Sequence, residues 1–452
     1  MTQFIGSLSR KRNSENSVKD VALKMVLAMQ HLIAMFGATV LVPILTGLDP
    51  SIALFSAGLG TLIFHFCTKG RVPVFLGSSF AFIPVIIAVS EKYGDLRYAQ
   101  GGIIVVGAIY VLISLLIKKV GLNNINKILP AQVVGPMIIV IGVNLIPTAL
   151  EMTGVTQLIG GSKEALPGVI IAVITLSITL IIKVFNKGFL SQISILIAVV
   201  IGYTISLLMG QVSVAEIQNA QLVAIPNFTL PKFDIGAIAI VAPVVLAVFM
   251  EHVGDITTNG EVVGENFLEN PGLNRTLLGD GLATLMAGFV GGPANTTYGE
   301  NTGVLAITKN YNPAILRITA VFAILLSFVS KFGAVIRTIP QPVMGGISLI
   351  LFSMIALVGF KTIKREKVKF NIINIMVMGS ILFVGLSEKF LGFPIQIKIT
   401  ESVSISGLSL AAIVGVVLIV VIGNFIFNIV YKVSVIRSSS VQRKKRNSNH
   451  KK

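Results

Sequence analysis

The sequence predicts an all-α protein that crosses a membrane many times, and three observations indicate this class. Of its 452 residues, 54% are hydrophobic and 12% are charged, whereas soluble domains average about 25% charged residues. Apolar runs long enough to span a bilayer recur along the chain. Two further segments are interrupted by polar, glycine-rich sequence, and they occupy corresponding places in the two halves of the chain.

Twelve apolar runs of about 17–25 residues are interpreted as complete transmembrane helices. The two interrupted segments, at 74–89 and 296–307, are shorter because extended-looking residues lead into a short apolar run. We therefore expect fourteen membrane segments. The twelve complete runs begin near Lys24, Ser51, Gly101, Leu129, Leu166, Phe189, Ile235, Leu277, Ala314, Pro342, Phe370 and Gly407.

The formal net charge of +17 is distributed as the positive-inside rule describes. If the amino terminus is cytoplasmic, the basic loops around Lys69, Lys118 and Lys183 all fall on the cytoplasmic side, and so does the basic carboxyl-terminal end. This distribution explains the charge without a nucleic-acid partner and places both termini in the cytoplasm. The tails, 1–20 and 432–452, are expected to be solvated, and the second is basic enough to contact anionic lipid.

The two halves of the chain resemble each other. The sequence Met-Gln-His ending at His31 recurs as Met-Glu-His ending at His252, and Leu129–Gly135 resembles Ile339–Gly345. Seven segments in each half, an odd number, give the halves opposite orientations in the membrane. Inverted repeats of about 21–210 and 235–431, each with a broken segment, indicate a secondary transporter with its site near the midplane. The alternative is a helical bundle with incidental glycine and proline breaks.

Four acidic residues fall within the apolar segments: Glu251, Asp255, Asp280 and Glu300. A charged side chain at the bilayer centre costs at least ~2.5 kcal/mol, so such residues are commonly functional. Glu251 and Asp255 are four residues apart and therefore share one helix face.

Carboxylates only accept hydrogen bonds, so a pair facing a cavity suits a planar nitrogen heterocycle with several N–H donors. Because two close carboxylates cannot both ionise cheaply, we expect one to carry a proton. The alternative is that the acids pair with buried bases or cap backbone groups.

Residues beside the two breaks are candidates for contact with a flat ring. Phe80, Phe82 and Tyr298 could stack on it, although aromatic rings in a membrane core often serve packing alone. Gly299 would let a ligand approach the backbone closely. Glycines flank Asp280 and permit close helix approach.

Metal chemistry and disulfides are not expected. Cys67 is the only cysteine, which excludes an intrachain disulfide and a cysteine zinc site. The four histidines are too scattered to indicate a metal. We interpret His31 as a hydrogen-bonded structural histidine in preference to a proton relay.

The run from Glu300 to Lys309, ENTGVLAITK, resembles the signature of the nucleobase-ascorbate transporters. That signature is an acid, amide or proline, then N-x-G-x-x-x-x-T, then a basic residue or glycine. Gln30-His31, Gly77–Phe80 and Glu251-His252 are further matches, and the resemblance runs from about Val21 to Tyr431. Within this family, the sequence TTYGEN ending at Asn301 is most similar to that of the bacterial uracil permeases.

The resemblance implies a cytoplasmic-membrane importer of uracil that uses a proton gradient and needs no cofactor. A core and a gate subdomain would be interleaved within 21–431, with short strands in the third and tenth segments, and homodimers are common in the family. No enzymatic activity is implied. A xanthine or uric acid symporter of the same fold is the alternative.

The resemblance also assigns residue roles. Glu251 and Glu300 would hydrogen-bond the uracil ring, Phe80 would pack against it, and the backbone at Tyr298 and Gly299 would add polar contacts. Proton coupling or structural support would come from Asp255, Asp280, Asn301 and His31. Some uracil permeases have a histidine where this chain has Asp255, so the proton site could be arranged differently here.

Overall fold

The computed structural model describes residues 2–120, 130–398 and 404–419, and most of them are helical. In these ranges, seven helices are long and apolar enough to cross a membrane. A helix pair bent by 81°, Pro313–Ser327 with Ser330–Arg337, makes up to eight. Three shorter apolar helices bring further segments into the bundle. The chain is therefore an integral membrane protein. The predicted tail at 432–452 lies outside the described residues.

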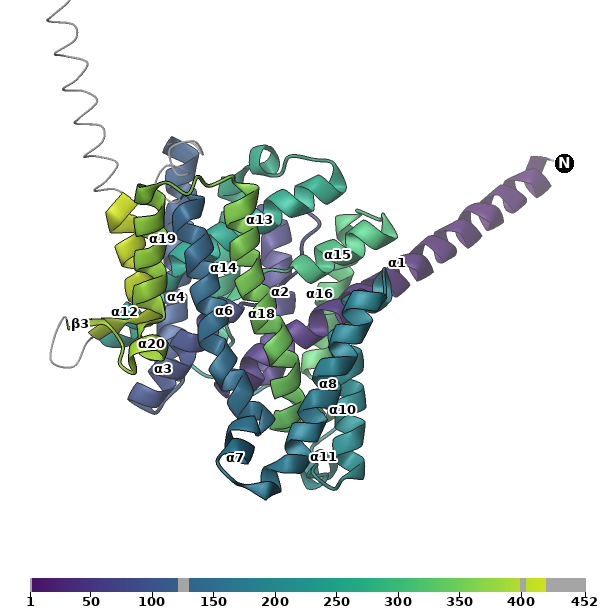
Figure 1. Cartoon of the computed structure of the whole chain (residues 1–452). Coiled ribbons are helices and arrows are strands. Elements are labelled where there is room, and N and C mark those ends of the chain that lie inside the picture. Colours follow the sequence, from purple (N-terminus) through teal and green to yellow (C-terminus); the bar gives the residue numbers. More distant parts are fainter. Residues whose placement is uncertain (1, 121–129, 399–403, 420–452) are drawn as a thin grey trace, which may run out of the picture.

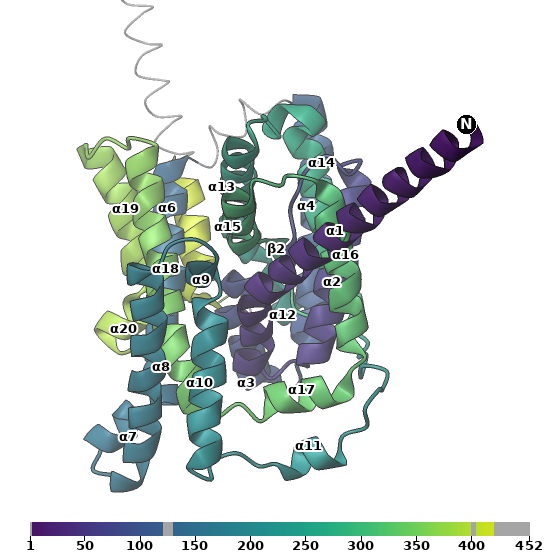
Figure 2. The same cartoon turned by 90° about the vertical axis from the view of Figure 1, so that its right-hand side faces the viewer.

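The helices form two packing groups, seen side by side in Figure 2. In the first group, α14 packs against α2 and α4, and α16 packs against α2 and α1. In the second group, α18 packs against α6 and α8, while α10 packs on α8 and α19 on α6. The bounds of the first group are α1 Thr2–Thr46, α2 Pro50–Cys67, α4 Arg97–Val120, α14 Leu273–Val290, α16 Pro313–Ser327 and α17 Ser330–Arg337. Those of the second group are α6 Ala131–Thr153, α8 Leu166–Phe185, α10 Ser194–Leu208, α18 Gln341–Arg365 and α19 Ile372–Gly385.

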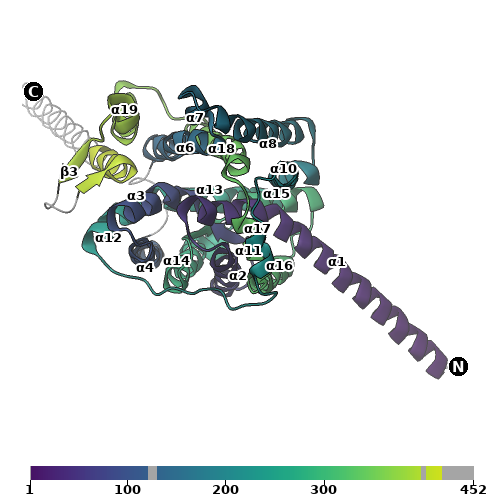
Figure 3. The same cartoon turned by 90° about the horizontal axis from the view of Figure 1, so that it is seen from below.

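A row of shorter elements lies between these groups, as the view along the bundle in Figure 3 makes clear. It contains the two broken segments and the two-part helix α12–α13, with one face of α1 beside them. The broken segments are β1 Leu76–Ser78 followed by η1 Phe80–Phe82 and α3 Ile83–Tyr93, and β2 Asn295–Thr297 followed by α15 Gly299–Thr308. The two-part helix is α12 Ile235–Val241, η3 Ala242–Val244 and α13 Val245–Val263.

Peripheral elements complete the described chain. Helices α11 and α17 pack together at one end of the bundle, and α7 lies at the same end beside α6 and α8, whereas α1 projects sideways out of the bundle (Figure 1). A second small sheet, β3 with β4, lies at the surface beside α20. The bounds are α7 Val155–Ile159, α9 Phe189–Gln192, α11 Ala215–Asn219, α20 Ser387–Leu391, β3 Gln396–Lys398 and β4 Ser404–Ser406.

Strands β1 and β2 pair antiparallel in the middle of the molecule, which confirms the predicted short strands. Gly77 pairs with Thr296 at the centre of a register that runs from Leu76 with Thr297 to Ser78 with Asn295. Backbone polar groups inside a membrane must be satisfied by protein partners, and each strand supplies them for the other. The chain can therefore hold two non-helical segments inside the helical bundle.

Small residues allow the closest helix contacts within each group. A Cβ added to Gly142 of α6 would lie 2.5 Å from the backbone nitrogen of Ala356 in α18. A Cβ on Gly281 of α14 would lie 2.7 Å from Cβ of Tyr110 in α4. The two helices therefore approach closely beside Asp280, as predicted from the glycines that flank this residue. Backbones this close gain dispersion contacts, which drive helix association where no water is available to be released.

The start of α12 is fixed outside the membrane-spanning segments. The Asp234 carboxylate caps this helix, accepting hydrogen bonds from the N–H groups of Gly236 at 2.8 Å and Ala237 at 3.1 Å. The Tyr93 hydroxyl, at the end of α3, donates to the same oxygen over 2.6 Å. That hydroxyl and the cap lower the pKa of Asp234 from its ordinary value. The first broken segment is thereby tied to α12.

Candidate functional site

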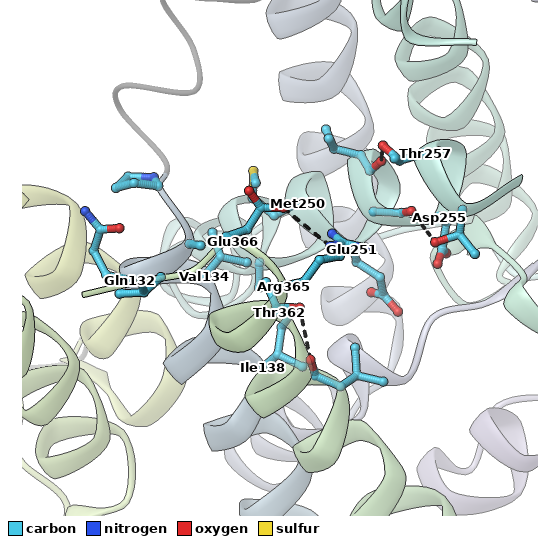
Figure 4. A pocket seen from close by; sticks show the side chains of 18 of the residues that line it. Gln132, Val134, Ile138, Met250, Glu251, Asp255, Thr257, Thr362, Arg365 and Glu366 are labelled. Carbon is cyan, nitrogen blue, oxygen red and sulfur yellow. Dashed lines mark hydrogen bonds and ion pairs between the residues drawn. The ribbon is translucent and has the colours of Figure 1, made fainter. Parts of the chain in front are cut away.

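A cavity of about 800 Å³ lies between α13 on one side and α6 and α18 on the other. Figure 4 shows side chains from these three helices around it. Its wall is mixed: apolar residues of α6 and α18 meet carboxyl, hydroxyl and guanidinium groups. A cavity of this size between helices, with a few polar groups, is a common form of small-molecule site.

Glu251 and Asp255 both line this cavity. Their four-residue spacing on α13 places them on one face, as the sequence predicts. Asp255 is held in place by the Thr297 hydroxyl of β2, which donates a hydrogen bond of 2.8 Å to Oδ2. One acid of the pair is thus fixed to the broken segment, whereas the Glu251 side chain lines the cavity and makes no hydrogen bond to the described residues.

Of the three aromatic candidates, only Phe80 lines the cavity. The ring of Phe82 is 1% exposed and packs in the core, so the predicted stacking role of Phe82 is wrong for this arrangement. Tyr298 is 4% exposed. Its hydroxyl donates to the Ser78 carbonyl over 3.0 Å and its N–H to the Phe75 carbonyl over 3.0 Å. The Tyr298 ring therefore packs against the strand pair and does not face the cavity.

The amino-terminal end of α15 carries Gly299 and Glu300, which are not among the residues that line the cavity. Gly299 is exposed, and no atom lies within 4 Å of a Cβ built on it. Glu300, in the first turn, is partly exposed, and a carboxylate there interacts favourably with the helix dipole. The structure thus leaves open space at this helix end while bringing Glu251 and Asp255, but not Glu300, into the cavity wall.

Two basic side chains of the second helix group lie near acidic residues of the site, one near Glu300 and one near Asp255. The Lys183 ammonium of α8 interacts electrostatically with Glu300. The Arg365 guanidinium of α18 lines the cavity and lies 3.9 Å from a Cβ built on Gly254, beside Asp255. Sequence reasoning assigned Lys183 to orientation and missed Arg365 as a site residue, because both stand at the ends of apolar runs where basic residues normally set topology.

The remaining predicted residues do not line the cavity, and each lies against another buried polar side chain. The Asn301 amide lies 3.1 Å from Nδ1 of His31 and donates to its carbonyl over 3.1 Å. Asp280, fully buried, lies with Oδ2 3.1 Å from Nδ1 of His252. The other ring nitrogen of His252 lies 3.0 Å from the Thr276 hydroxyl. These contacts join α1 to α15 and α13 to α14.

One supporting residue was missed by the sequence analysis. The Asn259 amide donates to the Pro73 carbonyl over 3.0 Å and to the Thr302 hydroxyl over 3.1 Å. It therefore joins α13 to both broken segments. Its position two turns after His252 on a polar stretch of α13 was the available signal. Among the described residues, no group of three or more metal-binding side chains occurs.

A helical membrane protein in which two broken segments meet beside a mixed, carboxylate-lined cavity is a solute transporter by class. The Permease family model (Xan_ur_permease) matches residues 23–393. The chain therefore belongs to the Permease family, and it is a transporter and not an enzyme.

Two bacterial relatives match over most of their length. The uracil permease of Bacillus caldolyticus is 42% identical over 401 residues, covering 87% of this chain and 90% of the relative. The uracil permease of Escherichia coli strain K12 is 40% identical over 392 residues, covering 86% and 89%.

A solved structure shares the fold. The transmembrane domain of the cyanobacterial bicarbonate transporter BicA has a TM-score of 0.58, with 14% identity, over 89% of this chain and 97% of that domain. At this identity the likeness concerns the fold alone.

Proposed function

We propose that this chain imports uracil across a bacterial cytoplasmic membrane by proton symport. The observation that carries the proposal is the pair Glu251 and Asp255 on one wall of the cavity. The 40–42% identity to bacterial uracil permeases supports uracil as the substrate. Uracil offers ring N–H donors, which carboxylates accept. No cofactor is required, because the coupled ion is the proton.

In this proposal, Glu251 and Glu300 hydrogen-bond the ring from α13 and α15, and Phe80 packs against its face. The Gly299 backbone adds contacts in the open space at the start of α15. The N–H of Tyr298 already donates to Phe75. A substrate contact by the Tyr298 backbone therefore uses the second lone pair of its carbonyl, since this N-cap carbonyl also accepts the first hydrogen bond of α15. Asp255 handles the proton, while Asp280, Asn301 and His31 support the site from behind.

The proposed architecture is a fourteen-segment inverted repeat. The broken segments provide its third and tenth members, and α12 with α13 provides the eighth. The first helix group with the central row is the core, and the second group is the gate, within residues 21–431. The repeats are about 21–210 and 235–431. Two such chains form a homodimer, with both termini and the tails at 1–20 and 432–452 in the cytoplasm.

Transport follows from movement of the core against the gate. The cavity separates α13 of the core from α6 and α18 of the gate, so a shift between the groups opens or closes it. With the termini in the cytoplasm, the end of α13 near Glu261 faces the cytoplasm, and this conformation is open to that side. Protonation and uracil binding together remove the like-charge repulsion between carboxylates that would oppose closure.

Radiolabelled uracil uptake into proteoliposomes with an inward proton gradient tests this function. We expect accumulation above the external concentration that a protonophore abolishes and excess unlabelled xanthine leaves intact. Strong competition by xanthine or uric acid would favour a purine symporter of the same fold. Accumulation that persists with the protonophore would exclude proton coupling.

A further inference from the structure

A second groove lies on the outer face of the first helix group, away from the proposed transport cavity. It has a volume of about 830 Å³ and is formed by α2, α4 and the start of α14. Figure 3 places these helices in the outer row, on the side opposite α6 and α18. This face is therefore presented to lipid.

One end of the groove is basic. Lys69, Lys118 and Arg275, from three different elements, are among the residues that line it, and none of its described lining residues is acidic. In the described part of the chain no carboxylate lies within 4 Å of these three cations. Arg275 is fixed by a 3.1 Å hydrogen bond to the Cys67 carbonyl. Three cations thus line one groove, and no carboxylate of the described residues neutralises them.

The rest of the groove is apolar and begins about one helical turn from the lysines. Its wall contains Phe66, 85% exposed, and Leu115, 52% exposed, together with Leu62, Leu278 and Leu282. Large apolar side chains exposed beside a basic cluster fit an amphiphile with an anionic head and hydrocarbon chains. A small free anion would use only the basic end.

We propose that this groove binds one anionic phospholipid of the cytoplasmic leaflet. Its phosphate contacts Lys69, Lys118 and Arg275, and an acyl chain lies along Phe66 and Leu115. Basic pockets between transmembrane helices on the cytoplasmic side have this preference for anionic head groups. The lipid would join α2, α4 and α14 at the face of the molecule that does not line the transport cavity. This inference does not depend on which solute is carried.

Native mass spectrometry of the full-length protein in detergent tests the proposal. The lipid probes are phosphatidylglycerol and zwitterionic phosphatidylcholine, and glycerol 3-phosphate is the free-anion probe. We expect one phosphatidylglycerol to be retained in preference to phosphatidylcholine. Glycerol 3-phosphate should neither be retained nor compete with phosphatidylglycerol. The double variant Lys69→Gln/Lys118→Gln should bind phosphatidylglycerol about 25-fold more weakly, since each cation near an anionic surface contributes about a factor of five.

The matched control is Lys119→Gln/Lys361→Gln. It removes the same charge from exposed lysines that do not line the groove, and its lipid affinity should equal that of the unaltered protein. The lysine variants carry the test because Arg275 also holds the Cys67 carbonyl. Equal binding of both lipids, equal loss in the control, or tight binding of glycerol 3-phosphate alone would overturn the proposal.

Discussion

At the scale of single residues, the site depends on how acids are held. Asp255 accepts a hydrogen bond from Thr297, Asp280 is buried against His252, and Glu251 faces the cavity. These three acids, all predicted within apolar segments, thus have three different surroundings in the fold. Because hydrogen bonding and burial act differently on each acid, the structure separates a ligand-facing acid, an acid tied to a strand and an acid in the packed interior.

Glu251→Gln and Glu300→Gln should each weaken uracil binding about 10- to 100-fold. The new amide presents donors where the ring also presents donors, and a hydrogen bond to a charged group contributes about 1.5–3 kcal/mol. Equilibrium binding to the purified variants measures this. Glu261→Gln is the control, because Glu261 lines the same cavity farther along α13 and should bind normally. Unchanged binding in both site variants would exclude the two-carboxylate arrangement.

Asp255→Asn should reduce proton-driven accumulation more than equilibrium binding. The amide keeps the shape of the side chain but cannot bind and release a proton. Uptake under a proton gradient and uracil exchange without one separate the two effects. Thr297→Val is the companion variant: it removes the donor to Oδ2 but leaves the carboxylate, so transport should slow without uncoupling. Equal loss of exchange and accumulation in Asp255→Asn would place Asp255 among the binding residues.

At the scale of elements, the strand pair is the feature that positions the site. The Tyr298 hydroxyl reaches the Ser78 carbonyl across the pair, and the ring passes over Gly77. A Cβ on Gly77 would lie 2.3 Å from two ring carbons of Tyr298. The glycine is required here for space and not for its backbone angles. Strand register, and through it the start of α15, depends on this contact.

Gly77→Ala should therefore lower thermal stability and uptake together. A methyl group forced into a well-packed position typically costs about 1–3 kcal/mol. Thermal unfolding in detergent and uptake in proteoliposomes measure the two effects. Gly379→Ala is the matched control, since no atom lies within 4 Å of its added Cβ and alanine favours the helix. If both variants behave alike, the close contact with Tyr298 does not limit the fold.

At the scale of the whole molecule, this chain shares its fold with the transmembrane domain of a bicarbonate transporter. The described cavity here carries Glu251 and Asp255 on α13, with the Arg365 guanidinium on the opposite wall. A shared fold therefore does not identify the solute, which has to be inferred from the side chains of the cavity. In the proposed mechanism, the fold provides the movement between the two helix groups, and the cavity side chains select the solute.

Membrane orientation can be tested by cysteine labelling in a Cys67→Ser background. Thr258→Cys lies in the cavity wall and is exposed, and it should react with an impermeant maleimide only in inside-out vesicles. Gln218→Cys, exposed on α11, should react only in right-side-out vesicles. The two positions control for each other. Labelling of Thr258→Cys from the outside would reverse the proposed orientation.

The sequence by itself determined the membrane class, the two broken segments and the shared face of Glu251 and Asp255. These follow from hydropathy and helix periodicity, which are local properties. The tertiary structure alone decided that Phe80 lines the cavity while Phe82 and Tyr298 are buried. It also decided that Thr297 donates to Asp255, that Asn259 joins α13 to the broken segments, and that Arg365 lines the cavity. Their roles depend on contacts between segments far apart in the chain. Hydropathy and spacing carry no information about which distant segment a side chain will meet.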